Sequence, residues 1–458
     1  MVLFVSSVAL PALTHSTVAS DAVGADTSQY DHYLMVQRGA MQASVEARTL
    51  AETPRDRPVS VASLHNEGSR GTDGVRAIRA DELHERGITG EGVRVGVVGS
   101  AFDPDSDAVG DQVAAHHVAH EQRLLTDTAH DTAVAEVVTR TTPDAELYLA
   151  SVGDSPTPES YADAVEWLVA NDVDVIVDSG SYFAPTTGEM DRISEAAERA
   201  SEQGVVFVTS AGNYADRHWA GVADGDEWVS FAPDTEANAL ADGNVTSGRV
   251  SLKLYWNTSA DYDLYLYRKL PGDDPVVAKS TTRQANDTNA SSVESVDAVV
   301  PKGTYYVSVY AHEDTTNGTQ LRLFSPHRTL THTTAAGSMV APATSEQVIT
   351  VGAVDAESGL VRAYSSRGHA GAGADVGAPD GVATTTTGTF YGTSAAAPYV
   401  AGSAALIKSH RSELSPTQVE QLLRETAHGA EGGRQIDAFA AVEAASNENV
   451  TARVDRRP

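Results

Sequence analysis

The chain has 458 residues, no cysteine and a formal net charge of −31, from 63 Asp and Glu against 32 Lys and Arg. So large an excess of acid repels phosphates and argues against a nucleic-acid partner. The missing cysteines exclude disulfides and thiolate metal sites, and no apolar stretch reaches the length of a membrane span. An acidic disordered chain is disfavoured, because 41% of the residues are hydrophobic and they fall into periodic runs. Acid-rich, lysine-poor composition is typical of proteins that fold in molar salt, where charge repulsion is screened.

The first 75 residues are expected to precede the folded part. Residues 1–25 include an apolar run with small residues near Ala19 and Ser20, which predicts a signal segment. Residues 26–75 are polar and irregular and predict a leader or pro-segment. We therefore expect an exported, extracellular protein in a high-salt environment.

From residue 76 the pattern becomes regular. Buried strands, such as 93–98 and 145–152, alternate with helical stretches, such as 130–139. The alternation predicts a doubly wound parallel α/β sheet over 76–219 and 331–445. Near its end, Ser415, Pro416 and Gln418 predict a capped helix start, and a tail follows at 446–458.

Residues 220–330 follow a different rhythm. Apolar and polar residues alternate in "RVSLKLYW", "DYDLYLYRK" and "GTYYVSVYA", and turn residues separate these runs. This pattern predicts an all-β, jelly-roll-like domain inserted into the α/β domain.

A serine opens a helix of small residues near the C-terminus. In "GTSAAAPYVAG", Ser394 lies where the free N–H groups and the positive end of the helix dipole favour negative charge. This stretch resembles the nucleophile motif of the subtilisin-like serine proteases. Two further blocks resemble that family in the same order: "HDTAVAEVVTRTTPDAELYLASV" around His130, and "VVFVTSAGN" around Asn213. The resemblance covers roughly 75–219 and 331–445.

The resemblance implies roles for particular residues. Ser394 falls on the nucleophile, His130 on the general base and Asn213 on the oxyanion donor. Further positions fall on the backbone that aligns the substrate: Ser179, Gly180, Ala211 and Gly212. It implies a serine endopeptidase acting on polypeptides, with no required cofactor and as a monomer.

The position of the family's catalytic aspartate holds glycine. The strand "VRVGVVGSAFD" aligns without gaps and puts Gly99 on the aspartate, while Asp131 stands where the family has glycine after the histidine. Three interpretations stay open. Asp131 or Asp103 substitutes for the missing acid, or a weak enzyme remains, or the cleft binds peptides without cutting them. Loss of the acid alone costs about four orders of magnitude in turnover. If the acid is missing, Gly99→Asp is expected to restore activity.

Other signals are weaker. A nucleotide-binding glycine turn would need glycine at positions 101 and 104, which hold Ala101 and Pro104. The cluster "HHVAHE" lacks the spacing of a helical zinc motif, so a solvated polar helix or loop is expected there. Asp261 and Asp263 could bind calcium, and the β insert could instead be a binding module for a polysaccharide or a cell surface.

Overall fold

The computed structural model describes residues 73–119, 127–184, 186–223, 227–283, 292–312, 318–356, 358–429 and 434–446. The predicted signal segment, nearly all of the predicted leader and the tail beyond residue 446 lie outside these ranges. Within them, no helix is long and apolar enough to cross a bilayer.

A seven-stranded parallel sheet forms the centre of the α/β part, as the alternating pattern predicted. Its strands lie in the order β15-β14-β5-β4-β1-β3-β2. Their bounds are β1 Arg94–Gly99, β2 Val113–Val118, β3 Glu146–Ser151, β4 Val175–Asp178, β5 Val206–Ser210, β14 Ile349–Asp355 and β15 Val376–Asp380. The central strands β1, β4 and β5 are buried along nearly their whole length because helices cover both faces of the sheet.

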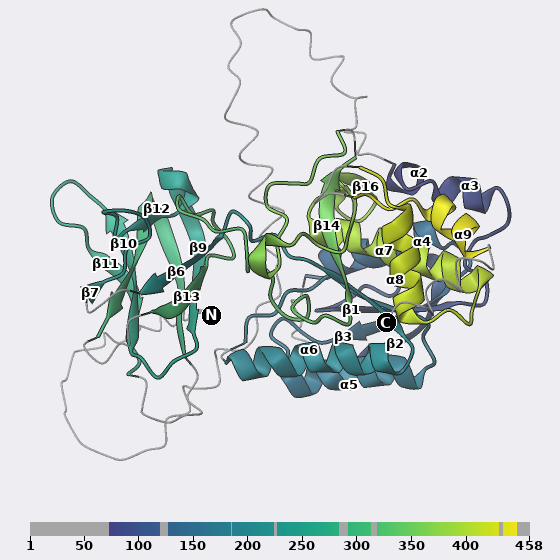
Figure 1. Cartoon of the computed structure of the whole chain (residues 1–458), viewed down its shortest axis with the longest axis horizontal. Helices are drawn as coiled ribbons and strands as arrows, with labels where there is room; N and C mark the ends of the chain where they lie inside the picture. The colour runs from purple at the N-terminus through teal and green to yellow at the C-terminus, as the bar shows by residue number, and fades with distance from the viewer. Residues whose placement is uncertain are drawn as a thin grey trace, which may run out of the picture. The chain divides into compact units, whose positions relative to one another are not determined.

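The helices divide between the two faces (Figure 1). One face packs against α4 Ala129–Thr141, α7 Thr393–His410, α8 Pro416–Thr426 and α9 Ala438–Ala445, in a core that also holds Val95 and Val97. The opposite face packs against α5 Pro158–Ala170 and α6 Thr187–Glu202, which lie side by side, and buries Val98 and Ile176. The short helices α2 Gly74–Ala77 and α3 Ala80–His84 precede β1.

Local signals account for the helix ends. At α8, Ser415 and Gln418 form the predicted capping box, with Pro416 in the first turn. At α5, Thr157 and Ser160 form a second capping box. These side chains satisfy N–H groups that a helix start leaves without partners.

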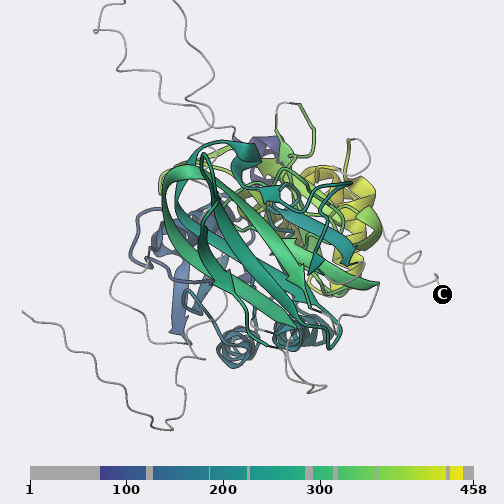
Figure 2. The same cartoon turned by 90° about the vertical axis from the view of Figure 1, so that its left-hand side faces the viewer.

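The alternating segment forms an antiparallel sheet (Figure 2). Its strands are β6 His218–Ala223, β7 Glu227–Trp228, β8 Asn238–Ala239, β9 Thr246–Trp256, β10 Tyr262–Lys269, β11 Val276–Ser280, β12 Val293–Ala311 and β13 Thr319–Phe324. The long strand β12 pairs with β9 along its first half and with β10 along its second, so the sheet folds over on itself. Leu252, Leu264 and Val307 share the core this encloses. The inserted domain and its limits at 220 and 330 stay predictions.

A two-stranded hairpin, β16 Val382–Thr384 and β17 Gly388–Phe390, precedes α7. Glu136 of α4 holds its turn, because its carboxylate accepts from Thr385 N at 2.7 Å and from Thr386 N at 3.1 Å. The hairpin is thereby tied to the helix that carries His130.

Candidate active site

The predicted site residues come together at the carboxyl ends of the central strands. Gly99 ends β1, Asp178 ends β4 and Ser210 ends β5. The N-termini of α4 and α7 bring His130 and Ser394 to the same edge. This edge of an open α/β sheet is where ligand sites form in general.

Ser394 is the second residue of α7 and is 4% exposed. Its hydroxyl donates to Ser179 O at 3.0 Å, and Ser179 Oγ donates back to Ser394 O at 3.1 Å. The start of the nucleophile helix is thus bonded to the end of β4.

Asn213 is oriented by the residue before the nucleophile. Its Oδ1 accepts from Thr393 N at 2.9 Å and from Thr393 Oγ1 at 3.2 Å, so the amide nitrogen faces the other way. Gly392 has a φ of 104°, and a Cβ there would lie 3.0 Å from Asn213 Nδ2. Glycine at 392 therefore keeps room beside the amide that would stabilise an oxyanion.

Asp380 at the end of β15 fixes the turn before Ser394. Its carboxylate accepts from Gly392 N at 3.2 Å and from Arg362 Nε at 2.6 Å, and it also bonds the hydroxyl of Tyr364. Sequence reasoning missed this anchor, because its partners lie 12 to 18 residues away from Asp380 in the chain.

His130 is held by its own neighbour in the sequence. Its Nδ1 lies 2.6 Å from Asp131 Oδ1, and the two side chains are 11% and 6% exposed. A carboxylate that faces Nδ1 accepts a hydrogen bond from the N–H group there. The proton of the neutral ring is then on Nδ1, and Nε2 is the basic nitrogen. This is the tautomer that a serine protease needs.

The other oxygen of Asp131 is bonded to the turn after β1. Asp131 Oδ2 accepts from Ser100 N at 2.6 Å and from Ala101 N at 3.1 Å. The carboxylate therefore lies over the end of the strand where the family resemblance expects an aspartate.

Gly99 makes room for this arrangement. A Cβ at residue 99 would lie 2.7 Å from Asp131 Cγ, 2.8 Å from Asp131 Cβ and 2.8 Å from Phe102 Cζ. The expectation that Gly99→Asp alone restores a missing acid therefore conflicts with the structure, because the new side chain would meet the carboxylate already there. The Asp131 carboxylate thus occupies the space beside Gly99 at the end of β1.

The second predicted substitute, Asp103, does not take this role. Asp103 is exposed, and its backbone N–H donates to Thr132 Oγ1 at 3.0 Å. Phe390 from β17 packs edge-on against the His130 ring, with 5.5 Å between ring centroids. Phe390 was not predicted from the sequence.

Asp178 adds a buried carboxylate next to the site. It is fully buried and accepts from Tyr161 Oη at 2.6 Å, from Gly180 N at 2.7 Å and from Tyr182 Oη at 3.1 Å. Burial raises the pKa of Asp178 to about 6, although these hydrogen bonds act to lower it; the nearby Asp131 raises it further. Sequence reasoning treated Asp178 only as part of a strand end.

The predicted substrate-aligning residues lie around Ser394. Ser179 and Gly180 follow β4, and Ala211 and Gly212 follow β5. Gly212 has a φ of 94°, and its N–H donates to Thr393 Oγ1 at 3.1 Å. Their contacts with a substrate stay predictions.

The histidine cluster does not form the predicted helix or loop. His116 and His117 lie in β2, where His116 bonds Ser151 Oγ at 2.8 Å and His117 stacks on Trp167. His120 lies outside the described residues. The apolar alternation that marks most strands is absent from "VAAHHV", which is why the sequence signal failed there.

At the predicted calcium position, His312 Nε2 lies 3.9 Å from Asp261 Oδ2 and 3.2 Å from Asp263 Oδ1. Within the described ranges, no group of three or more acidic or histidine side chains is arranged to hold a metal ion.

Comparison with known proteins agrees with this geometry. The model of the subtilase family, Peptidase S8, matches residues 90–332 and 315–453. Subtilisin E of Bacillus subtilis (strain 168) is 26% identical over 191 residues, which cover 38% of this chain and 49% of subtilisin E. An alkaline protease of Alkalihalobacillus alcalophilus is 37% identical over 198 residues, covering 40% and 47% of the two chains. The matches thus span about half the length of these relatives.

The fold has a solved counterpart. The CspB protease of Clostridium perfringens superposes with a TM-score of 0.57 at 16% identity, over 82% of this chain and 99% of that one. That likeness concerns the α/β fold. The family match, which covers most of the chain, identifies it as a member of the subtilase family.

Proposed function

We propose that this protein is a serine endopeptidase whose triad is Ser394, His130 and Asp131, with Asn213 as an oxyanion donor. One observation carries the proposal: the 2.6 Å contact between His130 Nδ1 and a carboxylate that two backbone N–H groups hold in place. It favours an intact triad over an impaired one.

Each residue then has a chemical task. His130 Nε2 takes the proton of the Ser394 hydroxyl as Oγ attacks the scissile carbonyl carbon, and later gives that proton to the leaving amine. Asp131 keeps the imidazole in the required tautomer and stabilises its cation. The Asn213 amide donates to the oxygen that becomes negative, a contribution worth about 3–4 kcal/mol in subtilisin itself. Water then repeats the sequence to release the acid product. None of these steps requires a cofactor.

The finer parts of the proposal concern setting and partners. The apolar N-terminal run and the acid-rich composition support export into a high-salt environment, and an extended polypeptide is the expected substrate. A monomer is proposed because the triad is complete within one chain. Calcium at Asp261 and Asp263 is a separate proposal, open to test by calorimetry.

A second candidate is a cleft that binds peptides without cutting them. The observation that favours it is the Ser394 hydroxyl, which donates its proton to Ser179 O and not to the imidazole. Binding without turnover follows if a bound peptide does not shift that hydroxyl to His130.

An exchange of residues tests the triad directly. Asp131→Asn is expected to lower peptide hydrolysis and fluorophosphonate labelling of Ser394 about 10⁴-fold, the magnitude known for loss of a triad acid. Gly99→Asp alone is expected to lower both as well, because its side chain meets Asp131. The double variant Gly99→Asp/Asp131→Gly moves the carboxylate to the strand end and is expected to recover at least a hundredfold over Asp131→Gly.

Asp103→Asn is the matched control and is expected to keep wild-type rates. Equal rates in Asp131→Asn and wild type would contradict the proposed acid. If wild type is not labelled in molar salt yet protects a bound peptide from added protease, the binding cleft is the better account.

A further inference from the structure

A cavity of about 580 Å³ lies away from the catalytic residues, between the β-sheet of residues 218–324 and the α/β part. One wall is the face of that sheet carrying Tyr255, Arg322 and Phe324; the others come from α6 and from residues 334–344. Ser394, His130 and Asn213 do not line it. Its size is that of a typical small-ligand site.

Strand periodicity explains the composition of the sheet wall. Leu321 and Leu323 point into the core of the antiparallel sheet, so their neighbours on β13 point to the opposite face. There Arg322 pairs in register with Tyr255 of β9. Tyr255 Oη donates to Ala184 O at 3.0 Å, and Phe324 packs against Phe183, so this face is held against the α/β part.

Arg322 brings a positive charge into this cavity, and the Asp191 carboxylate that also lines the cavity forms no ion pair with it. Among the described residues, none forms an ion pair or a hydrogen bond with its guanidinium; its contact is with the Phe324 ring, whose centroid lies 5.9 Å from Cζ. Burial lowers the pKa of Arg322, although Tyr255 and Asp191 act in the opposite direction. Arg322 is half-buried, and an anion bound in the cavity would gain a charge-assisted hydrogen bond from its guanidinium.

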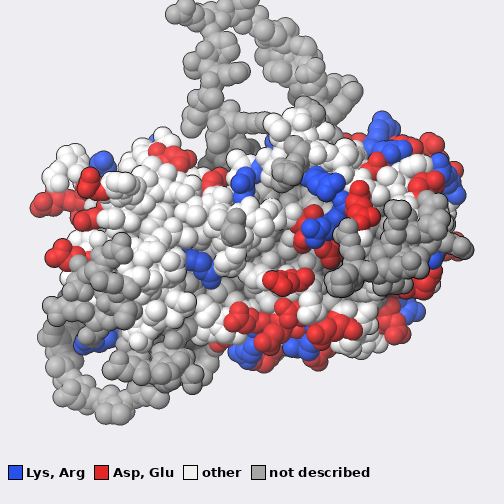
Figure 3. All heavy atoms as spheres, viewed as in Figure 1, with Lys and Arg blue, Asp and Glu red and all other residues white. Residues whose placement is uncertain are grey.

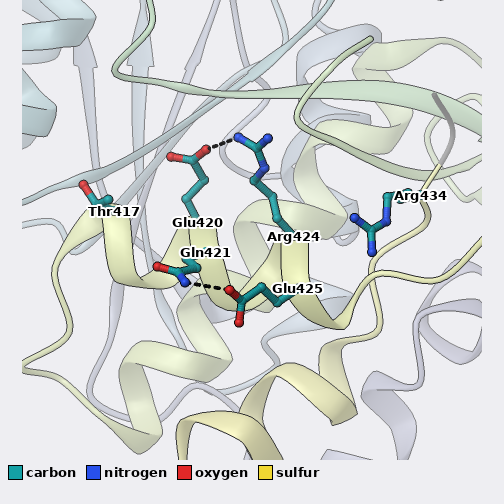
Figure 4. Close-up of a pocket in the computed structure, with 6 residues that line it drawn as sticks. All are labelled: Thr417, Glu420, Gln421, Arg424, Glu425 and Arg434. Carbon is teal, nitrogen blue, oxygen red and sulfur yellow. Dashed lines mark hydrogen bonds and ion pairs between the residues drawn. The ribbon is translucent and has the colours of Figure 1, made fainter. Parts of the chain in front are cut away.

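A second hollow, along α8, contains an arginine whose guanidinium is bonded to carboxylates of the chain. There, Arg424 Nη1 bonds Glu420 Oε1 at 2.9 Å and Asp375 Oδ1 at 3.1 Å, and Gln421 donates to Glu425 (Figure 4). Arg424 is therefore paired with carboxylates of the chain, whereas Arg322 is not.

We propose that the cavity beside Arg322 binds the carboxylate of a small ligand with an apolar body. The planar guanidinium matches a carboxylate with two parallel N–H···O bonds. Met190 of α6, 7% exposed, and Met339, 6% exposed, line the cavity and supply adaptable apolar surface for the rest of the ligand. A ligand seated there would contact both the β-sheet and the α/β part.

Two kinds of molecule carry this chemistry: a short peptide with a free C-terminus and a non-peptide aryl acid. N-acetyl-Ala-Phe and phenylacetate represent them as probes. N-acetyl-Ala-Phe amide is the neutral control, because it differs from the peptide acid only in the missing charge.

Methyl NMR can locate the binding. Met190 and Met339 are the methionines within the described residues, and both line the cavity. The full-length Ser394→Ala chain, labelled with ¹³C-methyl methionine in molar salt, keeps the peptide acid uncut. We expect saturable shifts of both methyl signals, assigned with Met190→Leu and Met339→Leu, with the peptide acid and at least tenfold weaker binding of its amide. Phenylacetate binding as well would show that the site recognises the carboxylate rather than a peptide.

Variants separate the charge from the fold. Arg322→Gln is expected to weaken acid binding at least tenfold. Arg322→Lys is expected to weaken it by less, because lysine keeps the positive charge but cannot donate two parallel N–H···O bonds. Asp191→Asn removes a carboxylate that also lines the cavity and is expected to tighten acid binding. Arg249→Gln, at an arginine that is 60% exposed, is the control and is expected to bind as before.

Equal binding of acid and amide would overturn the proposal. So would acid binding that survives Arg322→Gln, or binding that shifts neither methyl signal, which would locate the ligand in the catalytic cleft instead. Because Arg322 has no partner to lose, Arg322→Gln is expected to keep the unliganded methyl spectrum, which verifies its fold.

Discussion

At the scale of single residues, the proposed triad depends on where the acceptor oxygen for His130 lies. It does not depend on which residue of the chain supplies that oxygen. The imidazole of His130 needs a fixed acceptor at Nδ1, and Asp131 Oδ1 provides it at 2.6 Å from the adjacent residue. The N–H groups of Ser100 and Ala101 donate to the second oxygen of Asp131 and thereby fix the orientation of its carboxylate. In the proposed triad, Gly99 leaves the space that the Asp131 carboxylate occupies.

Asp178 gives a prediction at the same scale. Its pKa of about 6 in the folded protein lies above its ordinary value, so the folded state holds a proton that the unfolded state releases between about pH 4 and 6. The stability from this group is complete below pH 4 and is lost as the pH rises through 6. Relative to Asp178→Asn, the wild type is expected to lose about 2 kcal/mol of unfolding free energy between pH 4 and 7.

Denaturant titrations at several pH values measure this difference. Asp144→Asn, at an exposed carboxylate, is the control and should follow wild type. A gap between wild type and Asp178→Asn that stays constant with pH would show that Asp178 is ionised throughout.

At the scale of elements, the packing of two helices sets the geometry of the triad. His130 starts α4 and Ser394 starts α7, and the helices meet where Gly402 faces Thr141. A Cβ at residue 402 would lie 2.4 Å from Thr141 Cγ2. A side chain there would push the helices apart, and with them the base and the nucleophile.

We therefore expect Gly402→Ala to destabilise the protein by about 1–3 kcal/mol. It is also expected to lower the rate of peptide hydrolysis under conditions in which the variant is fully folded. Gly188→Ala in α6 is a matched control, because the nearest atom to its Cβ would be Thr186 Oγ1 at 4.0 Å. That variant is expected to be neutral or slightly stabilising, since alanine favours a helix over glycine. Thermal melts and steady-state kinetics check both, and a neutral Gly402→Ala would mean that the helices adjust freely.

At the scale of the whole molecule, charge is the dominant feature. Acidic side chains outnumber basic ones by 63 to 32, so many of them have no basic partner to pair with. Arginines interrupt the acids over α5 and α6 on the face seen in Figure 3, for example where Arg192 Nη1 bonds Glu159 Oε1 at 2.5 Å. Exposed pairs of this kind stabilise little and do not offset the repulsion.

Stability is accordingly expected to depend on ionic strength. The Debye length falls from about 10 Å at 0.1 M to about 3 Å at 1 M salt, which removes most repulsion between surface carboxylates. The melting temperature should rise steadily between 0.05 M and 2 M KCl. The same series in an uncharged osmolyte distinguishes charge screening from stabilisation by exclusion of a solute from the protein surface. A melting temperature that does not depend on the KCl concentration would contradict this prediction.

Much of this protein follows from its sequence alone. The alternation of strands and helices predicted the parallel sheet, because a strand covered on both faces must be apolar throughout. The blocks around His130, Asn213 and Ser394 indicated the family, since each combines a reactive side chain with the small residues its turn requires. Local periodicity failed at His116 and His117, where an edge strand carries polar side chains.

Only the tertiary structure decided between the substitutes for the missing acid. Asp131 and Asp103 are both near His130 or Gly99 in sequence, but the strand end, the start of α4 and the turn at Ser100 had to be placed in space before one carboxylate could be seen to contact the imidazole. The same holds for Phe390 and the cavity at Arg322, whose partners come from distant segments. Sequence periodicity specifies which face of an element is buried, whereas distances between functional atoms depend on how those faces pack.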